Sequence, residues 1–214
     1  MENMTNNQPK PRRGRPPKVA RENTDTRALL IRSGVEVLTE SGFAAAGIDG
    51  ILKKVGVPKG SFYHYFKSKE DFGQAVIAHY ASYFAAKLDK YLLDESIAPL
   101  QRIVKFADGA KRGIVKFEFK RGCLVGNLGQ EVAILPDSYR LILQNIFAVW
   151  QTKMQACLET AQQQGDIKKN INCAQQAEYF WIGWEGAVMR ARLVQSVQPL
   201  DLYIATFIAS IATS

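Results

Sequence analysis

Residues 57–72 read VPKGSFYHYFKSKEDF and place three lysines among closely spaced aromatic residues. Pro58 supplies a fixed φ for a first helical turn, which predicts a short helix from about Lys59 to Phe66. Phe62 and Phe66, at positions i and i+4, share one face of that helix, and we expect them to hold it on a hydrophobic core. The hydroxyl, imidazole and ammonium groups around them then face solvent or a partner.

A second short helix is expected just before this one. Gly56 ends it by accepting a left-handed turn. Its apolar residues follow the i, i+3, i+4, i+7 spacing of a helix: Ile48, Ile51, Leu52 and Val55. Two short helices joined by a tight glycine turn describe a helix-turn-helix, whose second helix enters the major groove of DNA. The groups on it that suit phosphate oxygens and base edges are those of Ser61, Tyr63, His64, Lys59, Lys67 and Lys69.

The remainder of the chain also has helical signals. Helical spacing from Thr24 stops at Gly42, and Ser68 caps a long helix that reaches about Tyr91. No segment alternates with period two between hairpin turns, so we predict an all-α protein. The further helices are expected from Pro99 to about Phe119, from 136 to 165, from 172 to about 195 and from 199 to about 212, with a glycine-punctuated link or short helix at 121–131.

We divide the chain into three parts: a basic arm (1–22), a helix-turn-helix DNA-binding domain (23–68) and a helical ligand-binding and dimerisation domain (69–214). The net charge is +8, and six Lys and Arg residues without any acidic residue lie between positions 3 and 21. Such a segment is expected to be disordered and to bind a polyanion. Arg13 and Arg15, in the sequence RGRP, resemble the core of an AT-hook that enters an A/T-rich minor groove. A solubilising tail is the alternative.

Composition limits the other classes of function. The longest apolar stretch, residues 202–212, is too short to span a bilayer, and no apolar segment of a signal peptide follows Met1. Three widely spaced cysteines indicate reduced thiols, and they favour neither a disulfide framework nor a zinc site. We therefore expect a cytoplasmic protein that has no metal and no cofactor and does not enter a membrane.

The segment GVPKGSFYHYFKSKEDF, residues 56–72, resembles the DNA-binding signature of the TetR family of bacterial transcriptional regulators. The long helix after it and the all-α remainder agree with the layout of that family. The resemblance implies a homodimer, which places two recognition helices on a palindromic operator in double-stranded DNA. We expect the dimer surface on the last two long helices. The implied DNA contacts, to which we add the imidazole of His64, are Lys59, Gly60, Ser61, Tyr63 and Lys69.

Two later segments, RGCLVGNLGQE (121–131) and FWIGWEGAVMRA (180–191), resemble the branch of this family that contains acrylate-responsive and N-ethylmaleimide-responsive repressors. The resemblance implies a pocket among the central helices. It also implies that the signal is a small electrophile or an unsaturated carboxylate such as acrylate. The candidate ligand-binding residues in these segments are Cys123, Asn127, Glu131, Trp181, Trp184, Glu185 and Arg190.

Cys123 has two interpretations. Lys120 and Arg121 precede it closely, and their charges would favour the thiolate, which is the reactive form of cysteine. A buried, inert cysteine is the alternative. The sequence does not separate a covalent from a noncovalent response.

Residues in the segment 180–191 also have alternative interpretations. Trp181 and Trp184 either wall the pocket or pack in the core. Glu185 either forms a buried ion pair with Arg190 or Arg192, or lies on a solvated helix face.

Two other classes of protein are considered. A thiol-dependent enzyme would use Cys123, but no histidine follows residue 79 and no phosphate-binding loop is present. An architectural protein for AT-rich DNA would leave the large apolar domain without a role. We therefore predict a ligand-responsive transcriptional repressor and not an enzyme.

Overall fold

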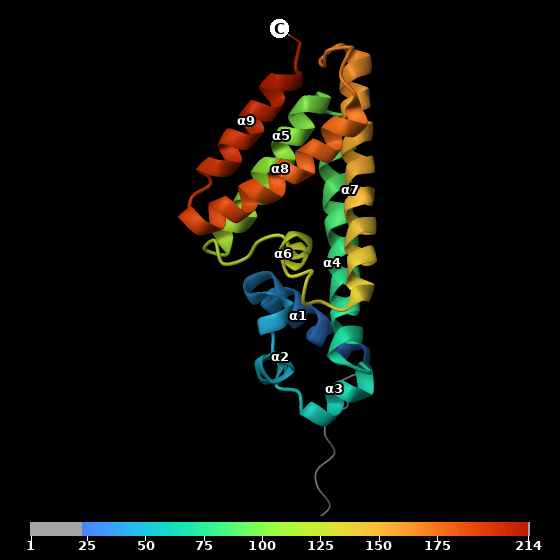
Figure 1. Ribbon diagram of the computed structural model, residues 1–214, viewed down its shortest axis with the longest axis vertical. Helices are drawn as coiled ribbons and strands as arrows, with labels where there is room; N and C mark the ends of the chain where they lie inside the picture. The colour runs from blue at the N-terminus through green and yellow to red at the C-terminus, as the bar shows by residue number, and fades with distance from the viewer. Residues whose placement is uncertain (1–22, 214) are drawn as a thin grey trace, which may run out of the picture.

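The computed structural model describes residues 23–213, and every regular element in this range is an α-helix (Figure 1). This confirms the all-α prediction. Outside the helices, the described residues contain one isolated β-bridge, between Ile167 and Ala212. The helices are α1 (Asn23–Ala45), α2 (Ile48–Val55), α3 (Lys59–Tyr65), α4 (Lys69–Leu92), α5 (Pro99–Lys116), α6 (Leu124–Gln130), α7 (Asp137–Gln164), α8 (Cys173–Val194) and α9 (Gln198–Ile211).

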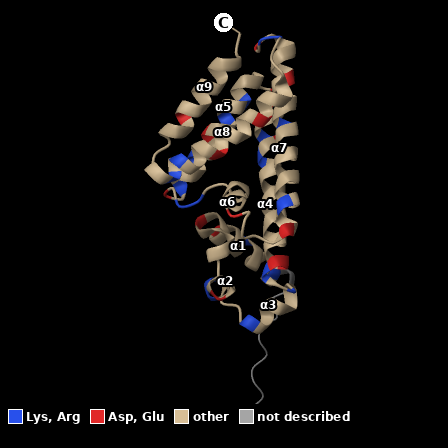
Figure 2. Cartoon of the chain, viewed as in Figure 1, with Lys and Arg blue, Asp and Glu red and all other residues tan. Residues whose placement is uncertain are grey.

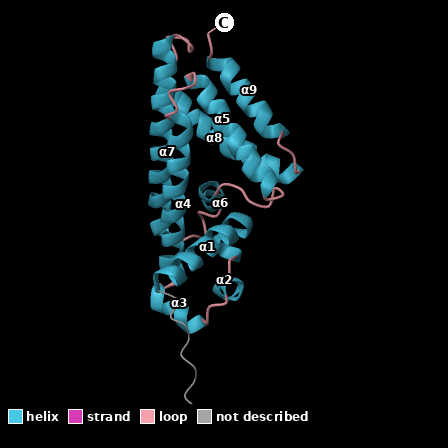
Figure 3. Ribbon diagram, turned by 180° about the vertical axis from the view of Figure 1, so that it is seen from behind, coloured by secondary structure: helices cyan, strands magenta, loops and turns pink. Residues whose placement is uncertain are grey.

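The long helix α4 connects the two ends of the molecule. At its start it packs against α1, and further along it runs beside α7 and contacts α5 (Figures 1 and 3). Helices α1–α3 gather at one end, whereas α5, α8 and α9 gather at the other. The short helix α6 lies between the two groups and contacts α1, α4 and α7. No helix in the described range is long and apolar enough to cross a membrane.

Most helices begin and end where local signals predict. Gly56 and Gly165 adopt left-handed φ values of 66° and 85° and end α2 and α7. Ser68 caps α4 by accepting a hydrogen bond from the Asp71 amide at 3.0 Å. Asn172 caps α8 in the same way. These positions confirm the predicted ends.

Two predicted boundaries differ from the structure. Helix α5 ends at Lys116 and not near Phe119, because Glu118 and Phe119 have left-handed φ values of 52° and 58° that a helix does not continue through. In α1, the backbone leaves helical geometry at Gly42, with φ of 77°, but the helix then resumes to Ala45. Both departures lie where the two groups of helices meet.

Aromatic rings fill the core at both ends. Near the N-terminal helices, the Phe72 ring lies 5.4 Å from Phe62 and 5.0 Å from Phe66. Among the later helices, the Trp150 ring lies 4.3 Å from Phe84 and 5.1 Å from Trp181. Both clusters belong to one continuous hydrophobic core. The same core therefore supports α3 and the walls of the cavity described below.

Candidate functional site

Helix α3 is about two turns long and has one buried and one exposed face. Phe62 and Phe66 are buried against the core, as predicted from their spacing. The Tyr63 side chain is 54% exposed, and its ring packs edge-on against Phe62 with centroids 5.3 Å apart. Lys59, Gly60 and His64 are also exposed, whereas Ser61 is half-buried. The outer face of α3 thus presents most of the predicted DNA-contacting residues together.

The two predicted DNA-contacting lysines differ in their surroundings. Lys59 Nζ lies 3.0 Å from Asp49 Oδ1 on α2, in an exposed ion pair that water can readily replace. Lys69 Nζ instead donates a hydrogen bond of 2.8 Å to the Phe43 carbonyl and lies over the Phe43 ring. Lys69 therefore ties α4 to α1 in this structure. Figure 2 shows further basic residues on α2, where Lys53 and Lys54 are exposed. Arg13 and Arg15 lie outside the described residues.

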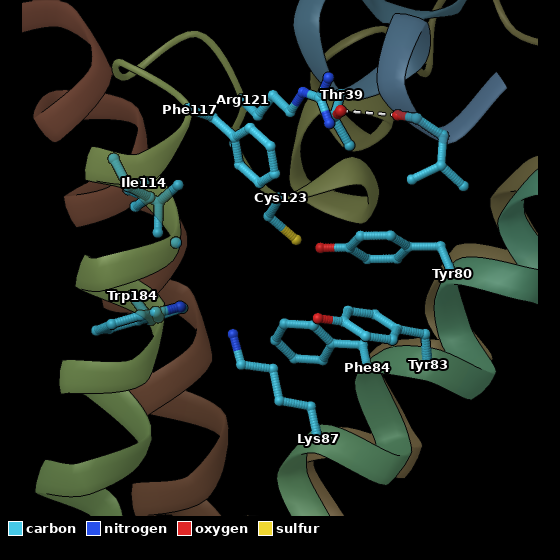
Figure 4. Close-up of a pocket in the computed structure, with 15 residues that line it drawn as sticks. Thr39, Tyr80, Tyr83, Phe84, Lys87, Ile114, Phe117, Arg121, Cys123 and Trp184 are labelled. Carbon is cyan, nitrogen blue, oxygen red and sulfur yellow. Dashed lines mark hydrogen bonds between the residues drawn. The ribbon is translucent and has the colours of Figure 1, made fainter. Parts of the chain in front are cut away.

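A cavity of about 290 Å³ lies where α1, α4, α5 and α8 meet the segment before α6 (Figure 4). Its apolar wall includes Phe84, Ile114, Phe117 and Trp184, and its polar groups come mainly from α4 and residues 121–123. Small-ligand pockets commonly enclose about 300–1,000 Å³, so this cavity suits a ligand of a few heavy atoms. The polar residues that line it are Thr39, Tyr80, Tyr83, Lys87, Arg121 and Cys123.

Cys123 lies in this cavity, where its thiol is hydrogen-bonded to a backbone amide and not to a basic side chain. The thiol is buried and caps α6 by accepting a hydrogen bond from the Gly126 amide at 3.5 Å. Burial raises the pKa of the Cys123 thiol well above its ordinary value, and the nearby carboxyl of Glu185 raises it further. The expectation that its basic neighbours favour the thiolate is therefore wrong.

The two basic neighbours are engaged elsewhere. Lys120 forms an exposed ion pair with Glu118. Arg121 donates a hydrogen bond of 2.8 Å to Glu40 and lies over the Phe117 ring. Each of the two charges is paired with a carboxylate, so closeness in sequence did not give the thiol a basic partner.

Glu185 is the second corrected prediction. It does not pair with an arginine: Arg190 is exposed on α8, and Arg192 bonds other groups. Oε1 of Glu185 is buried without a hydrogen-bond partner, and burial raises the pKa of this carboxyl to about 7. A Cβ at Gly126 would overlap Oε2, so glycine at that position makes room for the carboxyl.

Asn127 and Glu131, which were predicted to bind ligand, tie α6 to α1. Asn127 Nδ2 donates to the Thr39 carbonyl at 3.0 Å. Glu131 Oε2 accepts hydrogen bonds from the Phe43 and Ala44 amides at 3.0 and 2.9 Å. Neither residue lines the cavity of Cys123. Their geometry indicates a role in joining the helix-turn-helix to the remainder of the protein.

Arg192 adds a third side chain to this junction. Its guanidinium donates to Asn127 Oδ1 at 3.1 Å, to the Lys120 carbonyl at 3.0 Å and to the Glu40 carbonyl at 3.3 Å. It therefore links α8 to α1, to α6 and to the segment between α5 and α6. We call Arg192, Asn127 and Glu131 the α6 junction.

The two tryptophans differ in position. Trp184 lines the Cys123 cavity from α8. Trp181 packs in the aromatic core and lines a second, larger cavity of about 460 Å³ between α6, α7 and α8, together with Glu185. Both indoles are buried, and each lines a cavity while it packs in the aromatic core.

Lys87, Tyr80 and Tyr83 were not predicted as site residues. All three line the Cys123 cavity from α4. Their spacing of three, four and seven residues placed them on one face of a helix, which was the available signal. What the sequence did not reveal was which other helices cover that face.

Helices α2 and α3 follow each other through the left-handed turn at Gly56, which is the element order of a helix-turn-helix. Residues 30–76 match the family model of bacterial regulatory proteins, tetR family, and residues 99–207 match the tetracyclin repressor-like C-terminal domain. The chain is 47% identical to the transcriptional regulator AcuR of Cereibacter sphaeroides, over 92% of this chain and 90% of that protein. It is 30% identical to the HTH-type transcriptional repressor NemR of Escherichia coli K12, over 88% and 95% of the two chains.

Solved structures give the same result. The crystal structure of regulatory protein TetR from Rhodobacter sphaeroides superposes with a TM-score of 0.85 and 46% identity, covering 86% of this chain and 98% of that one. The reduced form of Escherichia coli NemR gives a TM-score of 0.79 and 28% identity, covering 88% and 98%. The chain belongs to the TetR family. It is a DNA-binding transcriptional regulator related to AcuR, and not an enzyme.

Removing the Tyr63 ring should weaken specific DNA binding without unfolding the protein, because the side chain is exposed on the outer face of α3. We expect Tyr63→Ala to lose about 1–3 kcal/mol of binding free energy, as is usual for one base or phosphate contact. Fluorescence anisotropy with the natural promoter DNA measures this loss. Leu93→Ala, at an exposed position after α4, is the control. Unchanged affinity in Tyr63→Ala would place the recognition surface elsewhere.

Glu185→Gln should change the pH dependence of stability. The pKa of Glu185 is about 7 in the folded protein against an ordinary 4.5, so the folded state keeps a proton that the unfolded state releases. This difference costs stability progressively as the pH rises from about 4.5 to 7. Glutamine stays neutral, so the variant should exceed wild type at pH 8 by about 1–3 kcal/mol, with the gain shrinking toward pH 4.5.

Urea denaturation of both proteins at pH 5, 6, 7 and 8, at one protein concentration, measures this difference. A gain that is the same at every pH would contradict a protonated Glu185 in the folded state.

Proposed function

We propose that this protein is a homodimeric repressor that binds a palindromic operator and is released from it by a small unsaturated carboxylate or electrophile. The observation that carries the proposal is the position of the Cys123 cavity. Val35 and Thr39 of α1 form part of its wall, together with α4, so the helices that support α3 also enclose the ligand space. The relationship to AcuR and to proteins named as repressors supports the same function.

The α6 junction offers a route by which ligand binding changes DNA affinity. Thr39 lines the cavity, and its carbonyl accepts hydrogen bonds from Asn127 and from the Gly122 amide. A ligand that displaces the segment around Cys123 therefore acts on the bonds that position α1. Helix α3 contacts α2, which packs on α1, and Phe62 of α3 packs on Phe72 of α4. A tilt of α1 and α4 therefore changes the separation of the two recognition helices in a dimer. A mismatch with the operator follows.

Exposed apolar side chains on α8 support the proposed dimer. Four exposed apolar residues of α8 are three, seven and four positions apart, and these spacings place them on one helical face. They are Tyr179, Ile182, Met189 and Leu193. Gly186 lies in the same stripe and leaves open space where a Cβ would be. Exposed apolar stripes of this kind mark protein–protein contacts. Pairing of two copies along α8, with α9 beside it, gives the twofold symmetry that a palindromic operator requires.

Charge on this stripe should prevent the dimer. Ile182 is 67% exposed in a single chain, so Ile182→Glu costs little in the monomer but buries a carboxylate in the paired state. We expect the variant to elute as a monomer in size-exclusion chromatography with light scattering and to lose operator binding. Leu93→Glu, with 66% exposure at the end of α4, is the matched control and should stay dimeric. A dimeric Ile182→Glu would move the interface to another surface.

Titration of the operator complex with acrylate and with N-ethylmaleimide tests the proposed inducer class. Burial keeps Cys123 mainly as a thiol, which is a poor nucleophile. We therefore expect acrylate to act by noncovalent binding and to release DNA from both wild type and Cys123→Ser. Release by the maleimide should require the thiol and leave an adduct visible by intact-mass analysis. Failure of both compounds to release DNA from the wild-type protein would contradict the inducer class.

A further inference from the structure

Lys87 stands apart from the other basic residues that line a cavity. Its side chain extends from α4 into the Cys123 cavity, with the ammonium group directed between Trp184 and Phe84 (Figure 4). Among the described residues, no carboxylate and no hydrogen-bond acceptor is paired with it. Arg121, the other cation in the lining, is already bound to Glu40 and lies 3.6 Å from Glu36. Lys87 thus provides an uncompensated positive charge inside a ligand-sized space.

The surroundings of Lys87 make this charge costly. Lys87 is half-buried, and aromatic and aliphatic side chains line the cavity that it enters. Burial lowers the pKa of Lys87, and the positive charge of Arg112 on α5 lowers it further. The groups that share the cavity with it are hydroxyls and a thiol, from Thr39, Tyr80, Tyr83 and Cys123, and none of them supplies a full negative charge. A buried cation without a partner is destabilising, and an anion that enters the cavity removes that cost.

We propose that Lys87 is the anchor for the carboxylate of the inducer, so that the cavity selects small monocarboxylic acids over neutral compounds of the same shape. This inference rests on the proposed function and specifies its ligand. The carboxylate accepts hydrogen bonds from the ammonium, and the short carbon chain lies against the aromatic wall in the direction of Cys123. The cavity therefore selects ligands by their charge at the Lys87 end and by their size at the Cys123 end.

The same geometry argues against other anions. One lysine balances one negative charge, and the guanidinium fork that suits a phosphate belongs to Arg121 and is already occupied. A dianion would therefore bring an excess charge into an apolar space. Arg190 is exposed on α8 and Arg192 is engaged in the α6 junction, so neither provides an alternative anchor within this cavity.

Acrylate and acrylamide form a matched pair of probes, because they share the vinyl group and nearly the same size but differ in charge. Isothermal titration calorimetry should give wild type a clear preference for acrylate over acrylamide. Lys87→Met keeps a flexible side chain of similar length but removes the charge. We expect it to bind acrylate about 10- to 100-fold more weakly, as for loss of a charged hydrogen bond, while its acrylamide affinity changes by less than about twofold. Propionate should follow acrylate, since the anchor does not need the double bond.

Two further variants complete the test. Lys90→Met changes an exposed lysine one turn along α4 and should keep the wild-type preference. Lys87→Gln serves as a second neutral variant if the methionine repacks the cavity. Without ligand, Lys87→Met should unfold at a temperature equal to or above that of wild type, because it removes a half-buried charge. A lower unfolding temperature would point to a structural role for the lysine and count against the proposal.

The outcomes separate the two proposals. If acrylate binds and releases DNA from wild type, but Lys87→Met and Lys87→Gln bind acrylate with wild-type affinity, Lys87 is not the anchor and the proposed function stands. If wild type prefers acrylamide or binds both compounds equally, charge selection is wrong. If wild type binds none of the three compounds, the anchor and the carboxylate inducer are both wrong, and release by the maleimide remains the test of an electrophile.

Discussion

The carboxylate of Glu131 holds the two groups of helices together. It accepts hydrogen bonds from two successive backbone amides, those of Phe43 and Ala44, just after Gly42. A side chain at residue 42 would overlap this carboxylate, and the φ of 77° at that position favours glycine in any case. The bend in α1 and the end of α6 therefore depend on each other. With Asn127 and Arg192 nearby, this contact sets the position of the helix-turn-helix relative to the cavity.

Two ionisable groups near Cys123 have different consequences: Lys87 lines the same cavity, and the Glu185 carboxyl lies close to the thiol. Lys87 is a cation in the cavity and favours an anionic ligand, whereas Glu185 is a carboxyl that burial drives toward its neutral form. The ionised Glu185 carboxylate raises the pKa of the Cys123 thiol. The neutral carboxyl lacks this charge, so it makes the thiolate easier to form. The protonation of Glu185 and the reactivity of Cys123 are thus coupled. At neutral pH, close to the pKa of Glu185, both forms of the carboxyl are populated.

The sequence predicted the helices well because helix ends depend on local signals. Gly56, Ser68 and Asn172 act within one turn of their own position, and the core face of α3 follows from the spacing of Phe62 and Phe66. The site was predicted less well because its contacts are long-range. Asn127 and Glu131 bond backbone groups that lie 87 or 88 residues away, and backbone donors and acceptors leave no trace in the sequence.

Cys123 and Lys87 are two further residues whose surroundings could not be predicted from the sequence. The basic residues next to Cys123 in the sequence are paired with carboxylates and not with the thiol. Lys87 has no distinctive neighbours in the sequence, but four other segments line the cavity that it enters.

The energy needed for a response is small compared with the contacts at the junction. A hundredfold loss of operator affinity corresponds to about 2.7 kcal/mol. One neutral hydrogen bond contributes about 0.5–1.5 kcal/mol, and one to a charged group about 1.5–3 kcal/mol. The Thr39 carbonyl accepts two neutral hydrogen bonds, and Glu131 accepts two that involve its charge. Disturbing part of this set supplies the required difference, so the ligand does not have to unfold any helix. It has only to favour a slightly different position of residues 117–123 against α1.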